Sequence, residues 1–271
     1  MTKFSIITIS KNQGKFIKKC IDSILEQNLK NFEHIVIDAN SDDQTHSILK
    51  KYNHENLIIK IEKDKGAADG LNKGFALSKG KILCFINSDD YLLPKILNQI
   101  ENEFSKNTKL EMIITPGIIV NEKERVINKV YPSFPTPKKY VYGICTFFQQ
   151  GIFFKSDLFN KTNGFNVSNK TNWDGELFLD LLKNVSKENI LRLDIESAAF
   201  KMHAGSITSL KNNEVEYEIN QRRLFNKIYG LKAKKSQIKK YLFFLTQILT
   251  DPKWFYHKVR YLIKYGSLNN K

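Results

Sequence analysis

Two adjacent carboxylates, Asp89 and Asp90, follow an apolar run at residues 81–87 in the segment NSDDY. Carboxylate oxygens in such a pair suit a hard divalent cation such as Mg²⁺ or Mn²⁺. That cation can neutralise the negative charge that develops on a diphosphate leaving group. The same residues could instead cap the helix expected after Pro94, which is the commoner role of an isolated acidic pair before a helix. The pair alone leaves both interpretations open.

Three further polar clusters follow apolar runs in the first 90 residues. The runs span residues 4–10, 34–38 and 57–62, and the clusters span residues 10–12, 38–43 and 62–69. Apolar residues at helical spacing lie between the runs, so the order is β-α-β-α-β-α-β, which favours parallel strands with helices on both faces. Ligands of such sheets bind beyond the carboxyl ends of the strands. We therefore expect the four polar clusters to meet at one edge.

Two of these segments could bind a nucleotide. Residues 38–45 (DANSDDQT) offer groups that can hydrogen-bond a base and a ribose, although an Asx-rich turn before a helix would look the same. Residues 66–74 (GAADGLNKG) place Asp69 and Asn72 three positions apart, on one face of a short helix. A glycine-rich helix start is the simpler explanation, but it does not account for so many polar groups.

Later segments predict antiparallel additions and one more helix. Strands are expected at residues 112–120, 125–131, 147–154, 190–193 and 198–202, and helices at 94–104 and 173–182. Asp174 lies near the start of the second helix. It can be an N-terminal cap, or a general base that removes a proton from an attacking hydroxyl.

These segments, in this order and spacing, resemble the family 2 glycosyltransferases over about residues 4–210. The resemblance rests on IITISKN, IDANSDDQT, the run from EKDKGAADG to NSDDYL, FQQGIFFK, GFN and WDGELFLDLL. It implies a GT-A fold with a Rossmann-like, mostly parallel central sheet, a nucleotide-diphosphate sugar donor, Mn²⁺ or Mg²⁺, and inversion at the anomeric carbon. Similar enzymes build bacterial surface polysaccharides.

The resemblance also assigns roles by position. It implies that the nucleotide and donor sugar lie along Thr8, Ser10, Asn12, Asp38, Asp64, Asp69, Asn72 and Ser88. It places the metal at Asp89, Asp90 and His203, the catalytic base at Asp174 with Glu176 in reserve, and Gln149 and Gln150 on the acceptor side. Asn87 or Ser88 stands where a strict DxD element has its first acid, so the direct ligand among the two aspartates stays open.

The last 46 residues differ from the rest of the chain. Residues 226–271 hold 11 Lys and Arg and one acid, within a total formal charge of +15. Two amphipathic helices are expected, at residues 238–249 and 254–265, separated by Asp251-Pro252. A basic amphipathic helix with Trp and Tyr can lie on an anionic membrane. Packing against the body, or a contact with a second subunit, is the alternative.

The sequence thus predicts a catalytic domain at residues 1–225, with halves at about 1–110 and 111–225, and a helical tail at 226–271. Three widely spaced cysteines, the absence of a signal-like start and the lack of an 18-residue apolar run lead us to expect a cytoplasmic protein, peripheral on the inner face of the membrane. The expected activity is sugar transfer to a saccharide or lipid-linked glycan. No nucleic-acid partner is expected. A sugar nucleotidyltransferase, and a nucleic-acid binder acting through the tail, are the alternatives.

Overall fold

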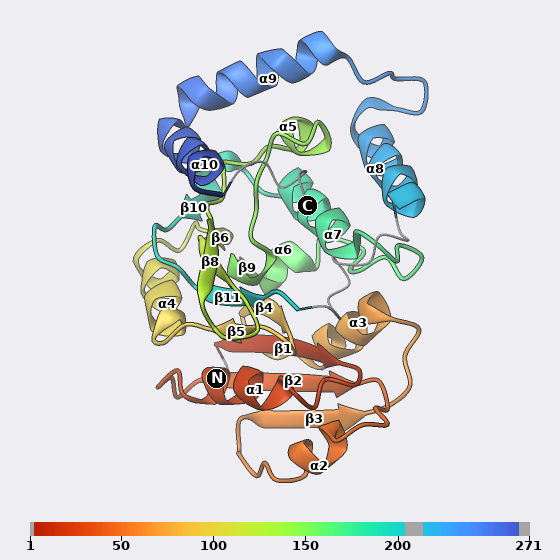
Figure 1. Ribbon diagram of the computed structural model, residues 1–271, viewed down its shortest axis with the longest axis vertical. Coiled ribbons are helices and arrows are strands. Elements are labelled where there is room, and N and C mark those ends of the chain that lie inside the picture. Colours follow the sequence, from red (N-terminus) through yellow and green to blue (C-terminus); the bar gives the residue numbers. More distant parts are fainter. Residues whose placement is uncertain (1–2, 204–213, 266–271) are drawn as a thin grey trace.

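A seven-stranded mixed sheet forms the centre of the computed structural model, which describes residues 3–203 and 214–265 (Figure 1). The strand order is β10-β6-β9-β4-β1-β2-β3. The strands are β1 (Phe4–Ser10), β2 (Phe32–Asp38), β3 (Leu57–Ile61), β4 (Ile82–Asn87), β6 (Met112–Ile114), β9 (Ile152–Lys155) and β10 (Ile190–Arg192). Strands β1 to β4 pair in parallel, as does β10 with β6, and only β9 runs antiparallel to its neighbours. The predicted mostly parallel sheet is confirmed.

Helices cover both faces of this sheet, as expected. Successive side chains of a strand point to opposite faces, so Ile6 joins the core beneath α1 (Ile17–Leu25) and α4 (Ile96–Lys106), whereas Ile7 joins the core beneath α3 (Ala67–Leu77) and α7 (Trp173–Asn184). The short helix α2 (Thr45–Leu49) packs beside α1. The continuous apolar runs of β1 and β4 are thus explained by burial on two sides.

A second, four-stranded sheet lies beside the first in the order β5-β11-β7-β8. Its strands are β5 (Tyr91–Leu92), β11 (Ala198–Lys201), β7 (Gly117–Val120) and β8 (Val126–Val130). The expected antiparallel pairing is found between β7 and β8, while β11 runs parallel to β7. Strand β5 of this sheet follows the acidic pair directly, and β7, β8 and β11 supply residues to the pocket described below.

The strand expected at residues 147–154 is only half right. Gln149–Gly151 form a 3₁₀ turn, in which Gly151 N donates to Phe148 O at 2.9 Å, and strand β9 begins at Ile152. A Cβ on Gly151 would lie 2.5 Å from Thr115 Oγ1, so the turn depends on glycine. Further short elements are α5 (Pro137–Val141), α6 (Ser156–Phe159) and a 3₁₀ turn at Lys187–Asn189.

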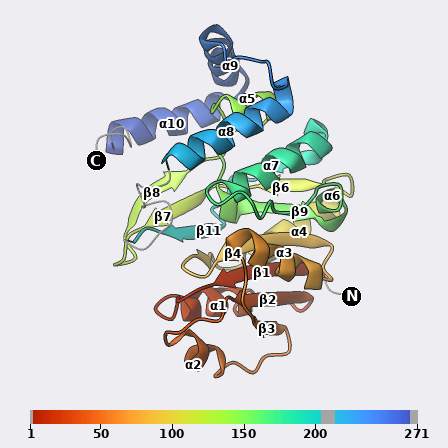
Figure 2. The same ribbon diagram turned by 90° about the vertical axis from the view of Figure 1, so that its right-hand side faces the viewer.

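Three helices end the described chain: α8 (Glu214–Tyr229), α9 (Gln237–Thr250) and α10 (Pro252–Tyr265). The two predicted tail helices are therefore confirmed. The boundary proposed at residue 225 falls inside α8, where Leu224 and Phe225 are fully buried in the main core. Figures 1 and 2 place α9 and α10 at the end of the molecule opposite to α2. Within the described residues, no helix is long and apolar enough to cross a membrane.

Candidate active site

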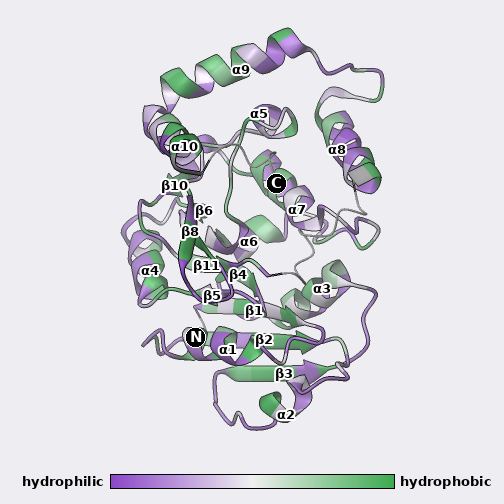
Figure 3. Cartoon of the chain, viewed as in Figure 1, coloured by the Kyte–Doolittle hydropathy of each residue, from purple (hydrophilic) through white to green (hydrophobic). Residues whose placement is uncertain are grey.

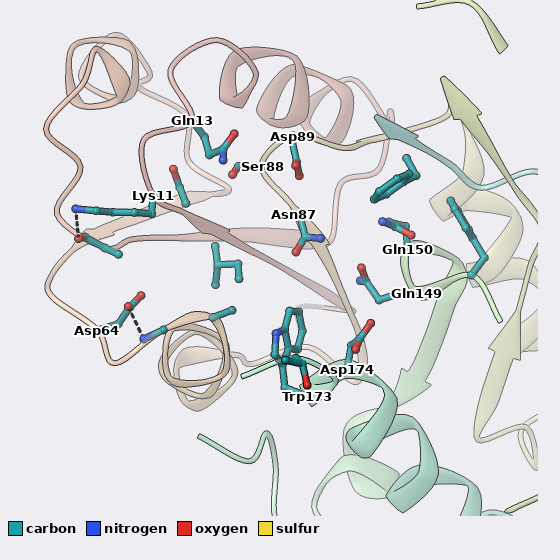
Figure 4. A pocket seen from close by; sticks show the side chains of 18 of the residues that line it. Lys11, Gln13, Asp64, Asn87, Ser88, Asp89, Gln149, Gln150, Trp173 and Asp174 are labelled. Carbon is teal, nitrogen blue, oxygen red and sulfur yellow. Dashed lines mark hydrogen bonds between the residues drawn. The ribbon is translucent and has the colours of Figure 1, made fainter. Parts of the chain in front are cut away.

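A cavity of about 900 Å³ opens at the carboxyl ends of β1 and β4, between the two sheets (Figure 4). Its first side comes from strand ends and the loops after them: Ser10, Lys11, Ala39, Asn40, Asp64, Asn87, Ser88 and Asp89. Its second side comes from the later half of the chain: Gln149, Gln150, Trp173, Asp174 and Phe200, among others. The expected meeting of the four polar clusters at one edge is confirmed.

Asp89 presents its carboxylate to this cavity. Its Oδ2 lies 3.1 Å from His203 Nε2, and the His203 ring packs on Phe16 with 4.5 Å between the ring centroids. A carboxylate and an imidazole beside a space that can hold diphosphate oxygens form a donor set that fits Mn²⁺ or Mg²⁺. Over residues 3–203 and 214–265, no group of three or more His, Cys, Asp or Glu side chains is arranged to hold a metal. The remaining ligands would have to come from the donor and from water.

Asp90 does not line the cavity. Its carboxylate is buried and accepts two hydrogen bonds, from Lys201 N at 2.9 Å and from Gln150 Nε2 at 2.6 Å. Burial and the adjacent charge of Asp89 raise the pKa of Asp90. The two aspartates therefore have different surroundings: Asp90 ties β4 to β11 and to the turn at Gln149–Gly151, and only Asp89 faces the cavity. The sequence left open which of the two aspartates is the direct ligand, and of the two only Asp89 is placed to be one.

Asp174 lies at the start of α7, on the opposite side of the cavity from Asp89 (Figure 4). Its Oδ1 accepts from Gly175 N at 2.7 Å. Trp173 fixes the start of the helix by packing against Phe85 and Phe165, with ring centroids 5.9 and 5.8 Å away. Burial raises the pKa of the Asp174 carboxyl. A carboxylate of raised basicity at a cavity wall is suited to accept a proton.

Glu176 does not reach the cavity, so the structure does not support its reserve role as the base. Its buried carboxylate lies between α7 and α8, where it accepts hydrogen bonds from Arg223 and, at 2.6 Å, from Lys227 Nζ. Asn169 Nδ2 donates to the same group at 2.9 Å. These partners hold the pKa of Glu176 below its usual value, against the effect of burial. Glu176 joins α8 and the 166–172 loop to the helix that carries Asp174.

We expect Glu176→Gln to destabilise the fold. It leaves Arg223 and Lys227 facing a neutral group, and removing one partner of a buried ion pair costs about 3–5 kcal/mol. Because both cations are about one-third exposed, solvent screening reduces the expected loss to about 1–3 kcal/mol. Urea unfolding measures this loss, with the exposed Glu188→Gln as the control. An unchanged unfolding free energy would contradict the structural role.

The nucleotide-side expectations divide into two groups. Ser10, Asp64 and Ser88 line the cavity, whereas Thr8, Asn12 and Asp38 do not. Asp38 is fully buried and accepts from Ser41 N at 2.8 Å and from His46 Nε2 at 2.8 Å.

Thr8 and Asn12 also make hydrogen bonds within the protein, Thr8 between strands β1 and β2 and Asn12 to the loop after β2. Thr8 Oγ1 lies 2.9 Å from His34 Nε2, and burial lowers the pKa of His34 to about 3. Asn12 Oδ1 accepts from Asp42 N at 3.0 Å. Asp38 and Asn12 thus hold the loop after β2, whereas Thr8 joins β1 to β2.

Asp69 and Asn72 also lie outside the cavity lining. Asp69 Oδ2 accepts from Lys65 N at 2.9 Å. Asn72 clamps a distant loop: its Nδ2 donates to Phe165 O at 2.8 Å and its Oδ1 accepts from Phe165 N at 2.9 Å. Both groups of the Asn72 amide are thus used within the protein, and they tie α3 to the loop that precedes Asp174.

Several lining residues were missed from the sequence. Lys11 Nζ donates to Asn40 O at 2.9 Å at the nucleotide end of the cavity, and Lys63 lies nearby. The opposite wall is apolar and aromatic: Ile119, Val130, Phe147, Phe148 and Phe200. The lysines could have been found from their places at strand ends. The apolar wall has no signal in the sequence, because its residues come from four separate segments.

A Rossmann-like sheet with an acid at a strand end, and a second acid across the cavity from a later helix, defines a glycosyltransferase of the GT-A fold. The family model "Glycosyl transferase family 2" matches residues 5–165, and the chain belongs to this family. Family membership confirms the enzyme class and decides against the sugar nucleotidyltransferase alternative.

Individual relatives agree with this assignment. The chain is 31% identical over 240 residues to the UDP-Glc:alpha-D-GlcNAc-diphosphoundecaprenol beta-1,3-glucosyltransferase WfaP of Escherichia coli, covering 86% of this chain and 89% of that protein. The fold is similar to that of S. aureus TarS residues 1–349 in complex with UDP-GlcNAc, with a TM-score of 0.68, 20% identity, and coverage of 96% and 81%. It is also similar to the mannosyltransferase PcManGT of Pyrobaculum calidifontis in complex with GDP-Man and Mn²⁺, with a TM-score of 0.58, 15% identity, and coverage of 98% and 76%.

Proposed function

We propose that this glycosyltransferase moves one sugar from a UDP-sugar to a lipid-linked saccharide, with inversion at the anomeric carbon, during synthesis of a surface glycan. The observation that carries the proposal is the placement of Asp89 and Asp174 on opposite sides of one cavity. Inversion requires the acceptor oxygen to attack from the side opposite to the leaving diphosphate. The two acids offer one group for each side.

The nucleotide end of the cavity supports a nucleotide-sugar donor. Ser10, Lys11 and Asp64 offer hydrogen-bonding groups and one positive charge there. The glucosyltransferase WfaP uses UDP-Glc, and TarS was crystallised with UDP-GlcNAc, so a UDP-sugar is the first choice. Because PcManGT was crystallised with GDP-Man, a GDP-sugar is the second choice of donor.

In the proposed reaction, Asp174 accepts the proton of the acceptor hydroxyl as that oxygen attacks the anomeric carbon. Its position is set by the packed Trp173 and by the first turn of α7, so little reorganisation is needed. Asp89 and His203 would hold Mn²⁺ or Mg²⁺. When bound, the metal neutralises charge on the diphosphate. Asp90 accepts a hydrogen bond from Lys201 N and so fixes the position of Asp89 relative to His203.

The acceptor side is wide and partly apolar. Gln149 and Gln150 lie there beside Phe147, Phe148 and Phe200. WfaP acts on GlcNAc-diphosphoundecaprenol, a saccharide on a lipid diphosphate. We infer an acceptor of the same class. Such an acceptor would bring the enzyme to the inner face of the cytoplasmic membrane, in agreement with the expectation for a peripheral protein.

A donor screen tests the proposal. UDP-Glc, UDP-GlcNAc, GDP-Man and dTDP-Glc are incubated with the enzyme and Mn²⁺ or Mg²⁺, and nucleoside diphosphate release is read with and without a short-chain GlcNAc-diphospholipid. We expect release from one UDP-sugar, increased by the acceptor. If no donor releases diphosphate from folded protein with either metal, the proposal fails. Release from GDP-Man alone would change the donor and keep the reaction.

A further inference from the structure

Helix α9 turns an apolar stripe toward solvent. Figure 3 shows apolar residues recurring along α9, although the helix lies at the outer end of the molecule. Five apolar residues on it are mostly exposed: Ile238 (73%), Tyr241 (69%), Leu242 (55%), Leu245 (55%) and Leu249 (81%). Their spacing of three, one, three and four residues places them on one face of the helix. We call these five residues the α9 stripe.

The opposite face of α9 is fixed to the body, so the helix cannot roll to bury the stripe. Gln247 is fully buried, where its Oε1 accepts from Lys139 Nζ at 2.8 Å and its Nε2 donates to Asp251 Oδ2 at 3.0 Å. Phe243 and Phe244 pack against the main core from the same side. Ser236 caps the start of the helix by accepting from Lys239 N at 3.3 Å.

Helix α10 is anchored next to α9 in the same way. Trp254 is 1% exposed and its Nε1 donates to Thr146 Oγ1 at 3.2 Å. Asp251, between the two helices, pairs with Arg192 at 2.7 Å. Tyr256 and Ile263, on the side of α10 away from Trp254, are exposed. Both helices are thus held rigidly while part of their apolar surface has no cover from the described chain.

The charge around the stripe selects the partner. Exposed cations flank it along the chain: Lys232, Lys234 and Lys235 precede α9, Lys239 and Lys240 lie in its first turn, and Lys253, which pairs with Asp194, and Arg260 follow in α10. The single acid of residues 226–271, Asp251, is buried and paired. Two copies of this face would bring lysines against lysines, because a twofold contact joins the same patch on both subunits. An anionic bilayer offers hydrocarbon to the stripe and phosphates to the lysines.

We propose that the α9 stripe and its flanking lysines are the surface through which the enzyme lies on an anionic bilayer. The inference rests on the proposed lipid-linked acceptor, and it adds that apolar insertion by α9 contributes to binding beside the charge of the tail. A rigid α9 would also hold the body at a fixed distance from the lipid surface from which the acceptor comes.

The test uses the full chain and sedimentation with vesicles of phosphatidylcholine, with and without phosphatidylglycerol. We expect the wild type to bind the anionic vesicles. The neutral variant Leu242→Gln/Leu245→Gln/Leu249→Gln should lower its partition coefficient about tenfold or more. Val126→Gln, at an exposed valine of β8 outside residues 226–271, is the matched control and should bind as the wild type. Lys239→Gln/Lys240→Gln should weaken binding to anionic vesicles only.

Two further readouts separate the possible failures. Donor hydrolysis without acceptor should be unchanged in the triple variant, so its absence in the wild type would refute the proposed function and not the docking surface. Sedimentation velocity without lipid gives the oligomeric state. The docking proposal is overturned if the wild type does not bind anionic vesicles, if the triple variant binds them equally well, or if the triple substitution instead dissociates a dimer.

Discussion

Asp174→Asn should reduce the turnover of sugar transfer by about 10²–10⁴-fold, the usual contribution of a general base. The amide keeps the size of the side chain and can still accept from Gly175 N, so the start of α7 should be preserved. Because the amide cannot take the acceptor proton, the substitution slows only the chemical step. Steady-state kinetics with saturating donor and acceptor measure the loss. Donor affinity, read by calorimetry with the nucleoside diphosphate, should change little.

The control for this substitution is Asp180→Asn, on the same helix and outside the cavity. It should keep near-normal turnover although it loses the 3.3 Å contact with Lys227. Near-normal turnover in Asp174→Asn would remove the base assignment. Since Glu176 is held between α7 and α8, the search for a base would then move to other groups of the cavity wall.

The same carboxyl should set the acid limb of the pH profile. Burial raises the pKa of Asp174, and the base works only when it is deprotonated. Turnover should therefore fall as the pH drops through a midpoint above the usual range of an aspartate. Stopped assays across the acid range locate this midpoint. A limb at the ordinary aspartate pKa would mean that bound substrates remove the effect of burial.

The first four strands could be predicted from the sequence because their signal is local. Each is a short run rich in apolar residues and followed by polar residues; β1, β2 and β4 are buried on both faces, whereas the edge strand β3 is partly exposed. The topology then brings Ser10, Asp64 and Asp89 to one edge, and this also follows from the order of the elements. Helices α7, α9 and α10 were equally readable from their apolar spacing.

The rest depends on contacts between residues far apart in the chain. The second sheet joins β5 with β11, separated by more than a hundred residues, and no local pattern records that pairing. The clamp of Asn72 on Phe165 and the bonds of Glu176 to α8 are of the same kind. Polar residues at expected ligand positions were thus assigned to the substrate, whereas the structure uses them to hold distant segments together.

Asp89→Asn should lower transfer by about 10³-fold or more. This follows if the substitution removes several kcal/mol of charge stabilisation at the diphosphate, since about 1.4 kcal/mol corresponds to a factor of ten. The reason is that the Asp89 carboxylate faces the cavity beside His203, where a divalent cation would lie. Loss of free Mn²⁺ signal in electron paramagnetic resonance, with UDP present, measures metal affinity separately from turnover. We expect Mn²⁺ binding by Asp89→Asn to be largely lost in a folded protein.

Asp90→Asn should behave differently, because Asp90 accepts hydrogen bonds with both oxygens. An Asn side chain has one acceptor and one NH₂ group, so either Lys201 N or Gln150 Nε2 would face a second donor. An unmade buried hydrogen bond costs about 1–3 kcal/mol of stability. Groups that orient a metal ligand typically change metal affinity by about 10–100-fold, so Mn²⁺ binding should weaken without disappearing. If Asp90→Asn abolished Mn²⁺ binding while Asp89→Asn retained it, the two aspartates would have to exchange roles, and β11 would have to move on metal binding to free the Asp90 carboxylate.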